Sequence, residues 1–191
     1  MKQLSMLEAR ESVSRARAHR RPEVLTDLRE RLASHLWLRL AGEYWSRCEG
    51  DRRALSDAMR TFEDWSGLMT SQRERTLHGS LPDEVVVWRG CHLGLNEDGL
   101  SYSLDADGAG HYPMRGRYRQ DEAEVVMVRA VVERDQCVVK LDCGVLEVLV
   151  RQALSRETVS HQWRPAADQY DIMNPVRPRR CLLGTCLHIP T

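Results

Sequence analysis

The first eighty residues carry apolar side chains at the spacing of amphipathic helices. From Pro22 to Cys48 an apolar residue recurs every third or fourth position, which lines one face of a helix. These residues are Val24, Leu25, Leu28, Leu32, Leu36, Leu40, Tyr44 and Trp45. After a break at residues 49–51 a second set follows at the same spacing: Leu55, Met59, Phe62, Trp65 and Met69. The pattern predicts two helices whose aromatic side chains pack in the core.

After Leu81 the helical spacing gives way to short runs rich in Val and Leu. Four such runs predict strands: residues 84–89, 124–132, 136–141 and 145–150. A short polar strand is expected at 100–103, and a short helix over 105–112. The second part of the chain is therefore predicted to be a sheet.

These elements predict an α+β protein. We expect an N-terminal helical region over residues 1–80, packed on a small split, mostly antiparallel β-sheet core over residues 81–160. The proline-containing residues 161–191 are expected to form a tail packed on the surface. A length of 191 residues suits one domain, and 42% hydrophobic residues are enough to build its core.

Charge and hydropathy narrow the classes of function. The 28 Lys and Arg residues balance 28 Asp and Glu residues, which argues against a protein that clamps nucleic acid over most of its surface. Basic stretches at residues 15–21 and 177–180 are predicted to be solvent-exposed surfaces. They give only weak support for nucleic acid as a partner. No apolar run is long enough for a membrane span or a signal peptide, so we expect a cytoplasmic protein without a membrane partner.

The cysteines do not have the spacing of a metal site or a disulfide framework. They are Cys48, Cys91, Cys137, Cys143, Cys181 and Cys186. None of the gaps between them is the two-residue gap of a zinc knuckle, and a chain with a full apolar complement needs no disulfides. Free thiols and no bound metal are predicted.

Three features of the sheet half could carry chemistry: Arg89 at the end of a buried strand, Ser101 and Ser103 two positions apart, and Glu147 inside an apolar strand. An arginine fork suits phosphate, and two hydroxyls on one strand face suit a ribose or an amide. A carboxylate among apolar neighbours is costly to bury without a purpose. Each feature also has a structural explanation of equal weight: an exposed strand end for Arg89, an edge strand for the serines and a solvent-facing position for Glu147.

Taken in this order, the three features resemble the Arg-Ser-Glu signature of the ADP-ribosyltransferase fold. The matching segments are Val87-Trp-Arg-Gly90, Gly99-Leu-Ser-Tyr-Ser-Leu-Asp105, Ala109 to Tyr112 and Glu147-Val-Leu-Val150. They look like those of small bacterial and phage proteins of that superfamily, and the similarity covers residues 84–150. Helices that precede two small packed sheets fit the same pattern.

The resemblance implies that NAD is the substrate and that ADP-ribose is transferred to a host or cellular macromolecule, expected to be a protein. Arg89 would bind a phosphate or ribose of NAD, and Gly90 would let the backbone approach the nicotinamide amide. Ser101 would support the nicotinamide ribose, with Ser103 completing the motif. Glu147 would be the catalytic residue, stabilising the oxocarbenium-like state. Arg89, Ser101 and Glu147 should then converge on one cleft between the two sheets.

One departure from the family pattern leaves an alternative open. Many members carry Glu or Gln two positions before the catalytic Glu, where this chain has Val145. Glu124 and Glu133 are rival candidates for the carboxylate. The alternative function is a catalytically inactive protein of this fold that binds and inhibits a host protein or a nucleic-acid-associated machine.

Overall fold

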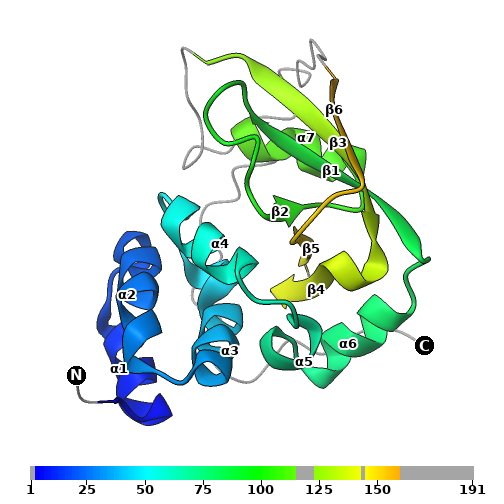
Figure 1. The fold of residues 1–191 in the computed structure, drawn as a ribbon. Helices are drawn as coiled ribbons and strands as arrows, with labels where there is room; N and C mark the ends of the chain where they lie inside the picture. Colours follow the sequence, from blue (N-terminus) through cyan, green and yellow to red (C-terminus); the bar gives the residue numbers. More distant parts are fainter. Residues whose placement is uncertain (1–2, 115–122, 143–144, 160–191) are drawn as a thin grey trace, which may run out of the picture.

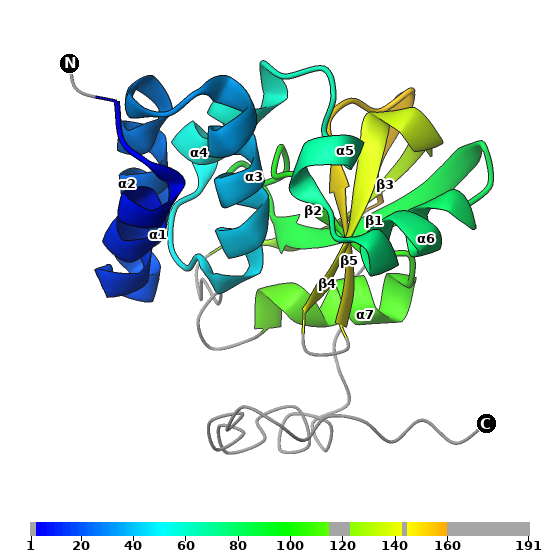
Figure 2. The same ribbon diagram turned by 90° about the horizontal axis from the view of Figure 1, so that it is seen from below.

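The computed structural model describes residues 3–114, 123–142 and 145–159, and it has the predicted α+β architecture. Figure 1 shows the helical half beside two small sheets. The helices of that half are α1 (Met6–Arg15), α2 (Arg21–Asp27), α3 (Ser34–Tyr44), α4 (Arg53–Arg60), α5 (Ser66–Met69) and α6 (Gln72–Gly79). The 3₁₀ turns Ala18–Arg20, Leu28–Arg31 and Trp45–Arg47 connect them. In Figure 2, α1 to α4 lie to one side of the sheets.

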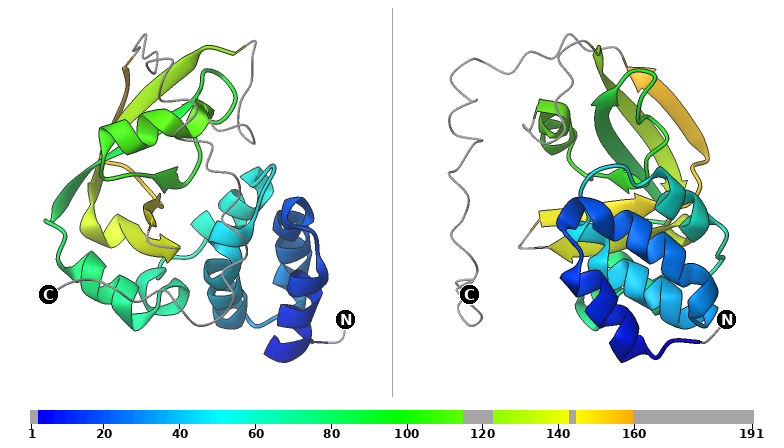
Figure 3. Two further views of the ribbon diagram at one scale, coloured as in Figure 1. Left: turned by 180° about the vertical axis from the view of Figure 1, so that it is seen from behind. Right: turned by 90° about the vertical axis from the view of Figure 1, so that its left-hand side faces the viewer.

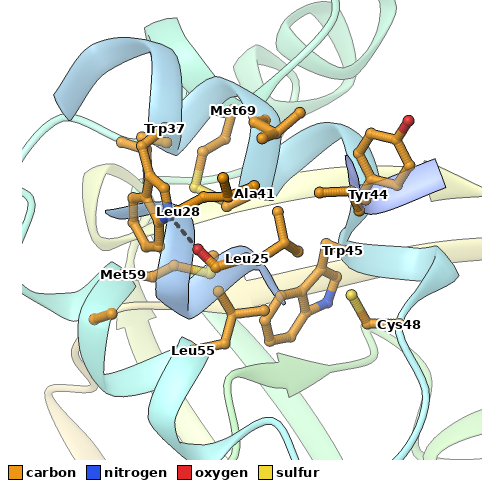
Figure 4. Packing of buried hydrophobic residues seen from close by; sticks show 14 of the residues in the cluster. Leu25, Leu28, Trp37, Ala41, Tyr44, Trp45, Cys48, Leu55, Met59 and Met69 are labelled. Atoms are coloured by element: carbon orange, nitrogen blue, oxygen red, sulfur yellow. Dashed lines mark hydrogen bonds between the residues drawn. The ribbon is translucent and has the colours of Figure 1, made fainter. Parts of the chain in front are cut away.

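The two long helices that the apolar spacing predicts are each broken in two, so that prediction is wrong in its bounds. Leu32 is extended between α2 and α3, and the chain folds back until the Trp37 indole N–H donates to the carbonyl oxygen of Leu25 at 2.6 Å (Figure 4). Similarly, α4 ends at Arg60, and the Trp65 indole N–H donates to the carbonyl oxygen of Met59 at 3.1 Å. The indoles thus satisfy carbonyls that a continuous helix would have bonded internally.

Within residues 3–114, 123–142 and 145–159, six strands form two antiparallel three-stranded sheets. The first sheet has the order β1 (Glu84–His92), β3 (Val125–Glu133) and β6 (Ser155–Val159). The second has the order β2 (Ser101–Tyr102), β5 (Val145–Val150) and β4 (Cys137–Asp142). Their strands run in clearly different directions in Figure 3. The split, antiparallel sheet is confirmed.

The predicted strands agree with β1 to β5, and the short helix is present as α7 (Ala106–His111). The strand β6 was not predicted, because its first four residues are polar and lack the apolar alternation that marks a strand. The predicted surface tail over residues 161–191 lies outside the described residues.

A backbone pair between β1 and the end of β2 joins the two sheets. The Trp88 N–H donates to the Ser103 carbonyl oxygen at 2.8 Å, and the Ser103 N–H donates to the Trp88 carbonyl oxygen at 2.7 Å. This pair places β2 next to β1 across the split. As a result, the strand carrying Arg89 lies beside the strand carrying Ser101.

Two clusters of buried side chains fill the interior. The larger one centres on Trp37, Trp45 and Leu55 of the helical half and includes Leu149 of β5, so the helices pack on one face of the second sheet. The smaller cluster lies between the sheets and includes Val148, the neighbour of Leu149 on the opposite face of β5. The second sheet is thus covered on both faces.

A buried ion pair also ties the helical half to the second sheet. Glu74 of α6 and Lys140 of β4 are 5% and 8% exposed, and their charged atoms lie 3.1 Å apart. The Glu74 carboxylate also accepts from the N–H groups of Ser71 at 2.7 Å and Leu141 at 2.9 Å. Lys140 donates in addition to the carbonyl oxygen of Met69 at 2.9 Å. Each member of the ion pair therefore also has a main-chain hydrogen-bond partner.

The three buried cysteines, Cys48, Cys91 and Cys137, are free thiols, as predicted for them. Burial raises the pKa of Cys48 and of Cys91 to about 11, and that of Cys137 to about 12. The other three cysteines lie outside the described residues. Within the described ranges, none of the helices has the length and apolar character needed to cross a membrane.

Candidate functional site

The motif residues lie on three neighbouring strands. Arg89 is in β1, Ser101 begins β2 and Glu147 lies in β5. Ser101 pairs with Leu149. Glu147 precedes Leu149 by two residues and lies on the same face of β5. The fold therefore brings together residues that are far apart in the chain.

Arg89 is held by main-chain carbonyl groups. Its Nε donates to the Asn96 oxygen at 3.0 Å, and its Nη1 donates to the Ser101 oxygen at 2.6 Å. The guanidinium also lies so close to Gly99 that a Cβ at that position would collide with it. Two of its three nitrogens thus fix the loop that connects β1 to β2, and the role of Arg89 toward NAD stays a prediction.

The strand register separates the side chains of Arg89 and Glu147. Counting from the Trp88–Ser103 pair, Arg89 shares a face with Tyr102, whereas Gly90 shares a face with Ser101 and Glu147. The side chains of Arg89 and Glu147 therefore leave opposite faces of their strands, and this register does not support the prediction that Arg89, Ser101 and Glu147 converge on one cleft. The link between them runs through the carbonyl group of Ser101.

The charges of Glu147 and Arg52 contribute to the pKa of Arg89. Burial lowers the pKa of Arg89 below its ordinary value, and the negative charge of Glu147 is among the influences that raise it. The positive charge of Arg52, from the helical half, lowers it further.

Gly90 and Ser103 position α7. A Cβ at Gly90 would collide with the carbonyl oxygen of Ala109, so a glycine is needed where α7 packs on β1. The Ser103 hydroxyl accepts from the N–H of Asp105 at 3.0 Å, and the Asp105 carboxylate caps α7 by accepting from the N–H of Gly108 at 2.7 Å. Both motif residues thus have a structural role, and their contact with NAD stays a prediction.

Glu147 is half-buried and receives a hydrogen bond from the helical half. The Trp45 indole N–H donates to its Oε1 at 3.3 Å. The rivals Glu124 and Glu133 are exposed at the two ends of the β3 segment, in the other sheet. Of the three candidate carboxylates, Glu147 is therefore the one on the strand that pairs with β2. The sequence showed Trp45 only as a core residue, since no local pattern links positions 102 residues apart.

Arginines from three elements hold the loop between β1 and β2. Arg60 of α4 donates to the Asp98 carbonyl oxygen, and Arg156 of β6 donates to the Asp98 carboxylate at 2.6 Å. With Arg89 on Asn96, these contacts join the helical half and both edges of the first sheet to one loop. Arg60 and Arg156 had no signal in the sequence, because their contacts are made with main-chain groups and with a distant loop.

Among the described residues, no group of three or more His, Cys, Asp or Glu side chains is arranged to hold a metal ion. Comparison of the chain with family models, with curated proteins and with solved structures finds no match.

Proposed function

We propose that this protein is an NAD-dependent ADP-ribosyltransferase-like enzyme that modifies a host or cellular macromolecule. The observation that carries the proposal is the arrangement of the three motif strands. The order Arg, Ser, Glu in the sequence becomes β1, β2, β5 side by side, linked by the Arg89–Ser101 hydrogen bond and the Ser101–Leu149 pair. This adjacency of the three strands supports the proposal, although the side chains of Arg89 and Glu147 leave opposite faces.

The chemistry follows from the charges. In the transfer, the bond between the nicotinamide nitrogen and the ribose carbon breaks, and nicotinamide leaves with the electron pair. The ribose carbon then carries positive charge until a nucleophile of the target bonds to it and loses its proton. The Glu147 carboxylate, which is half-buried on the strand that pairs with β2, would stabilise that positive charge electrostatically. Arg89 would keep Ser101 and its loop in place, and it remains the proposed partner of an NAD phosphate or ribose.

The test is the substitution Glu147→Gln, which keeps the size and one acceptor oxygen but removes the charge. Release of nicotinamide from labelled NAD, with a cell lysate as the source of acceptor, should fall about 10²–10³-fold. NAD affinity, measured by calorimetry, should change far less, because the interaction forms mainly in the transition state. The matched controls are Glu124→Gln and Glu133→Gln, which should leave both quantities unchanged.

Three results would contradict the proposal or its details. A wild-type chain that does not bind NAD at millimolar concentration would refute the enzyme. Full turnover by Glu147→Gln would remove its catalytic role, and a large loss in Glu124→Gln or Glu133→Gln would move that role to the residue concerned. Arg89→Ala should weaken NAD affinity more than Glu147→Gln does.

One observation favours the alternative, a protein of this fold that binds and inhibits a host protein or a nucleic-acid-associated machine. The Nε and Nη1 donors of Arg89 are already used by main-chain carbonyl oxygens, which reduces its capacity to bind a phosphate. Val145 in place of Glu or Gln points the same way. Capture of a lysate protein by a chain that does not bind NAD would support this function instead.

A further inference from the structure

Trp45 sits where the helical half meets the second sheet. It begins the 3₁₀ turn that directly follows α3, and it is 1% exposed. Figure 4 shows its ring beside Leu55 and Cys48 in the helical core. The guanidinium of Arg52 lies 5.1 Å from the ring centroid, within the range of a cation–π contact. The indole is therefore held by packing and has little freedom to turn.

The indole N–H of Trp45 has a different kind of acceptor from the indole N–H groups of Trp37 and Trp65, which are buried in the same core. The indole N–H groups of Trp37 and Trp65 donate to main-chain carbonyls and stabilise breaks between helices. The indole N–H of Trp45 instead donates to the Oε1 of Glu147. A buried indole N–H needs an acceptor, but a helix end would have served as well as a carboxylate.

We propose that Trp45 is a positioning residue for Glu147, and that the helical half is therefore part of the catalytic unit. This inference rests on the proposed function. An indole N–H can only donate, and here it holds the Oε1 of Glu147 toward the helices. With Oε1 held by the rigid ring, Oε2 is left for the ribose. A supporting contact of this kind fixes the orientation of a catalytic group more tightly than its own strand can.

The substitution Trp45→Phe tests this role, because it keeps an aromatic ring in the core and removes the donor. Turnover of NAD should fall about tenfold, as expected for the loss of one hydrogen bond to a charged group, while KM for NAD changes little. In a chain that already carries Glu147→Gln, the same substitution should add no comparable loss, because the two residues act through one carboxylate. Trp37→Phe and Trp65→Phe are matched controls: each removes a buried indole hydrogen bond, and each should leave turnover unchanged in the folded fraction.

A second measurement does not require NAD or a substitution at Trp45. In a ¹H–¹⁵N spectrum, Glu147→Gln should shift the indole signal of Trp45 and leave those of Trp37 and Trp65 in place. An unshifted Trp45 signal would refute the contact. In an active enzyme, a Trp45→Phe variant with the turnover of Trp65→Phe would refute the positioning role and leave the proposed function standing. A wild-type chain that neither binds nor cleaves NAD would refute both, even if the Trp45 signal shifts.

Discussion

The ion pair between Glu74 and Lys140 should be one of the most sensitive points of the fold. The substitution Glu74→Gln keeps the shape of the side chain but removes the charge. Lys140 would then be a buried ammonium whose remaining partner is the Met69 carbonyl oxygen at 2.9 Å, together with a neutral amide. Breaking a buried pair from one side costs about 3–5 kcal/mol. We expect about 3 kcal/mol, the lower end of that range, since the amide oxygen can still accept from the N–H of Ser71 or Leu141.

Urea denaturation at pH 7 measures this change in the free energy of unfolding. The control is Glu23→Gln, because the pair between Arg20 and Glu23 is exposed and should contribute less than about 1 kcal/mol. A loss of about 3 kcal/mol is large against the 5–15 kcal/mol that a domain typically has, so the unfolding midpoint should shift clearly. If Glu74→Gln lost no more than the control, the pair would not be isolated from water as its burial indicates.

The pH dependence gives an independent check. Burial raises the pKa of Glu74, but the N–H groups of Ser71 and Leu141 and the charge of Lys140 together lower it more, so that it lies below its ordinary value. A carboxyl group whose pKa is lower in the folded state stabilises the fold above the pKa of the unfolded state, and that stabilisation is lost as the pH falls through the folded value. The difference between wild type and Glu74→Gln should thus be largest near neutral pH and shrink below about pH 4. A difference that stays constant down to pH 2 would contradict this origin.

Two further predictions concern packing. Gly90→Ala should lower the free energy of unfolding by about 1–3 kcal/mol, because the added methyl group meets the Ala109 carbonyl oxygen. The control is Gly79→Ala, whose methyl group would enter open space at the end of α6 and should not destabilise the fold. Equal effects of the two substitutions in urea denaturation would show that α7 can move away. The three buried cysteines should react with a thiol reagent at pH 8 only as the chain unfolds, since burial raises their pKa values to about 11 or 12. Fast labelling of all three in the native state would show that water reaches them.

Local composition was sufficient to predict most of the sheet. The strands β1, β3, β4 and β5 are dense in Val and Leu, so their approximate bounds follow from residue type alone. The strand β6 has the residues Ser-Arg-Glu-Thr-Val, and it is a strand because β3 offers it a hydrogen-bonding edge. Polar edge strands carry little of the apolar signal on which such predictions depend.

The helix breaks could not be predicted from the apolar spacing, because the spacing continues through them. Leu28 and Leu32 fit the same helical face as Leu36, yet the chain turns between them. The turn is stabilised by the Trp37 indole on the Leu25 carbonyl group, a contact that exists only after the two segments pack together. Tertiary hydrogen bonding here overrides a local preference.

The candidate site divides in the same way. The sequence by itself determined the α+β class and the order of the Arg, Ser and Glu residues along the chain, because these depend on residue type and strand pattern. Only the tertiary structure decided that Arg89 binds the carbonyl group of Ser101 and that Trp45 donates to Glu147. The face a side chain takes depends on register with a distant strand, and the Trp45–Glu147 contact joins positions 102 residues apart. Such contacts form when whole elements pack, so no local pattern in the chain encodes them.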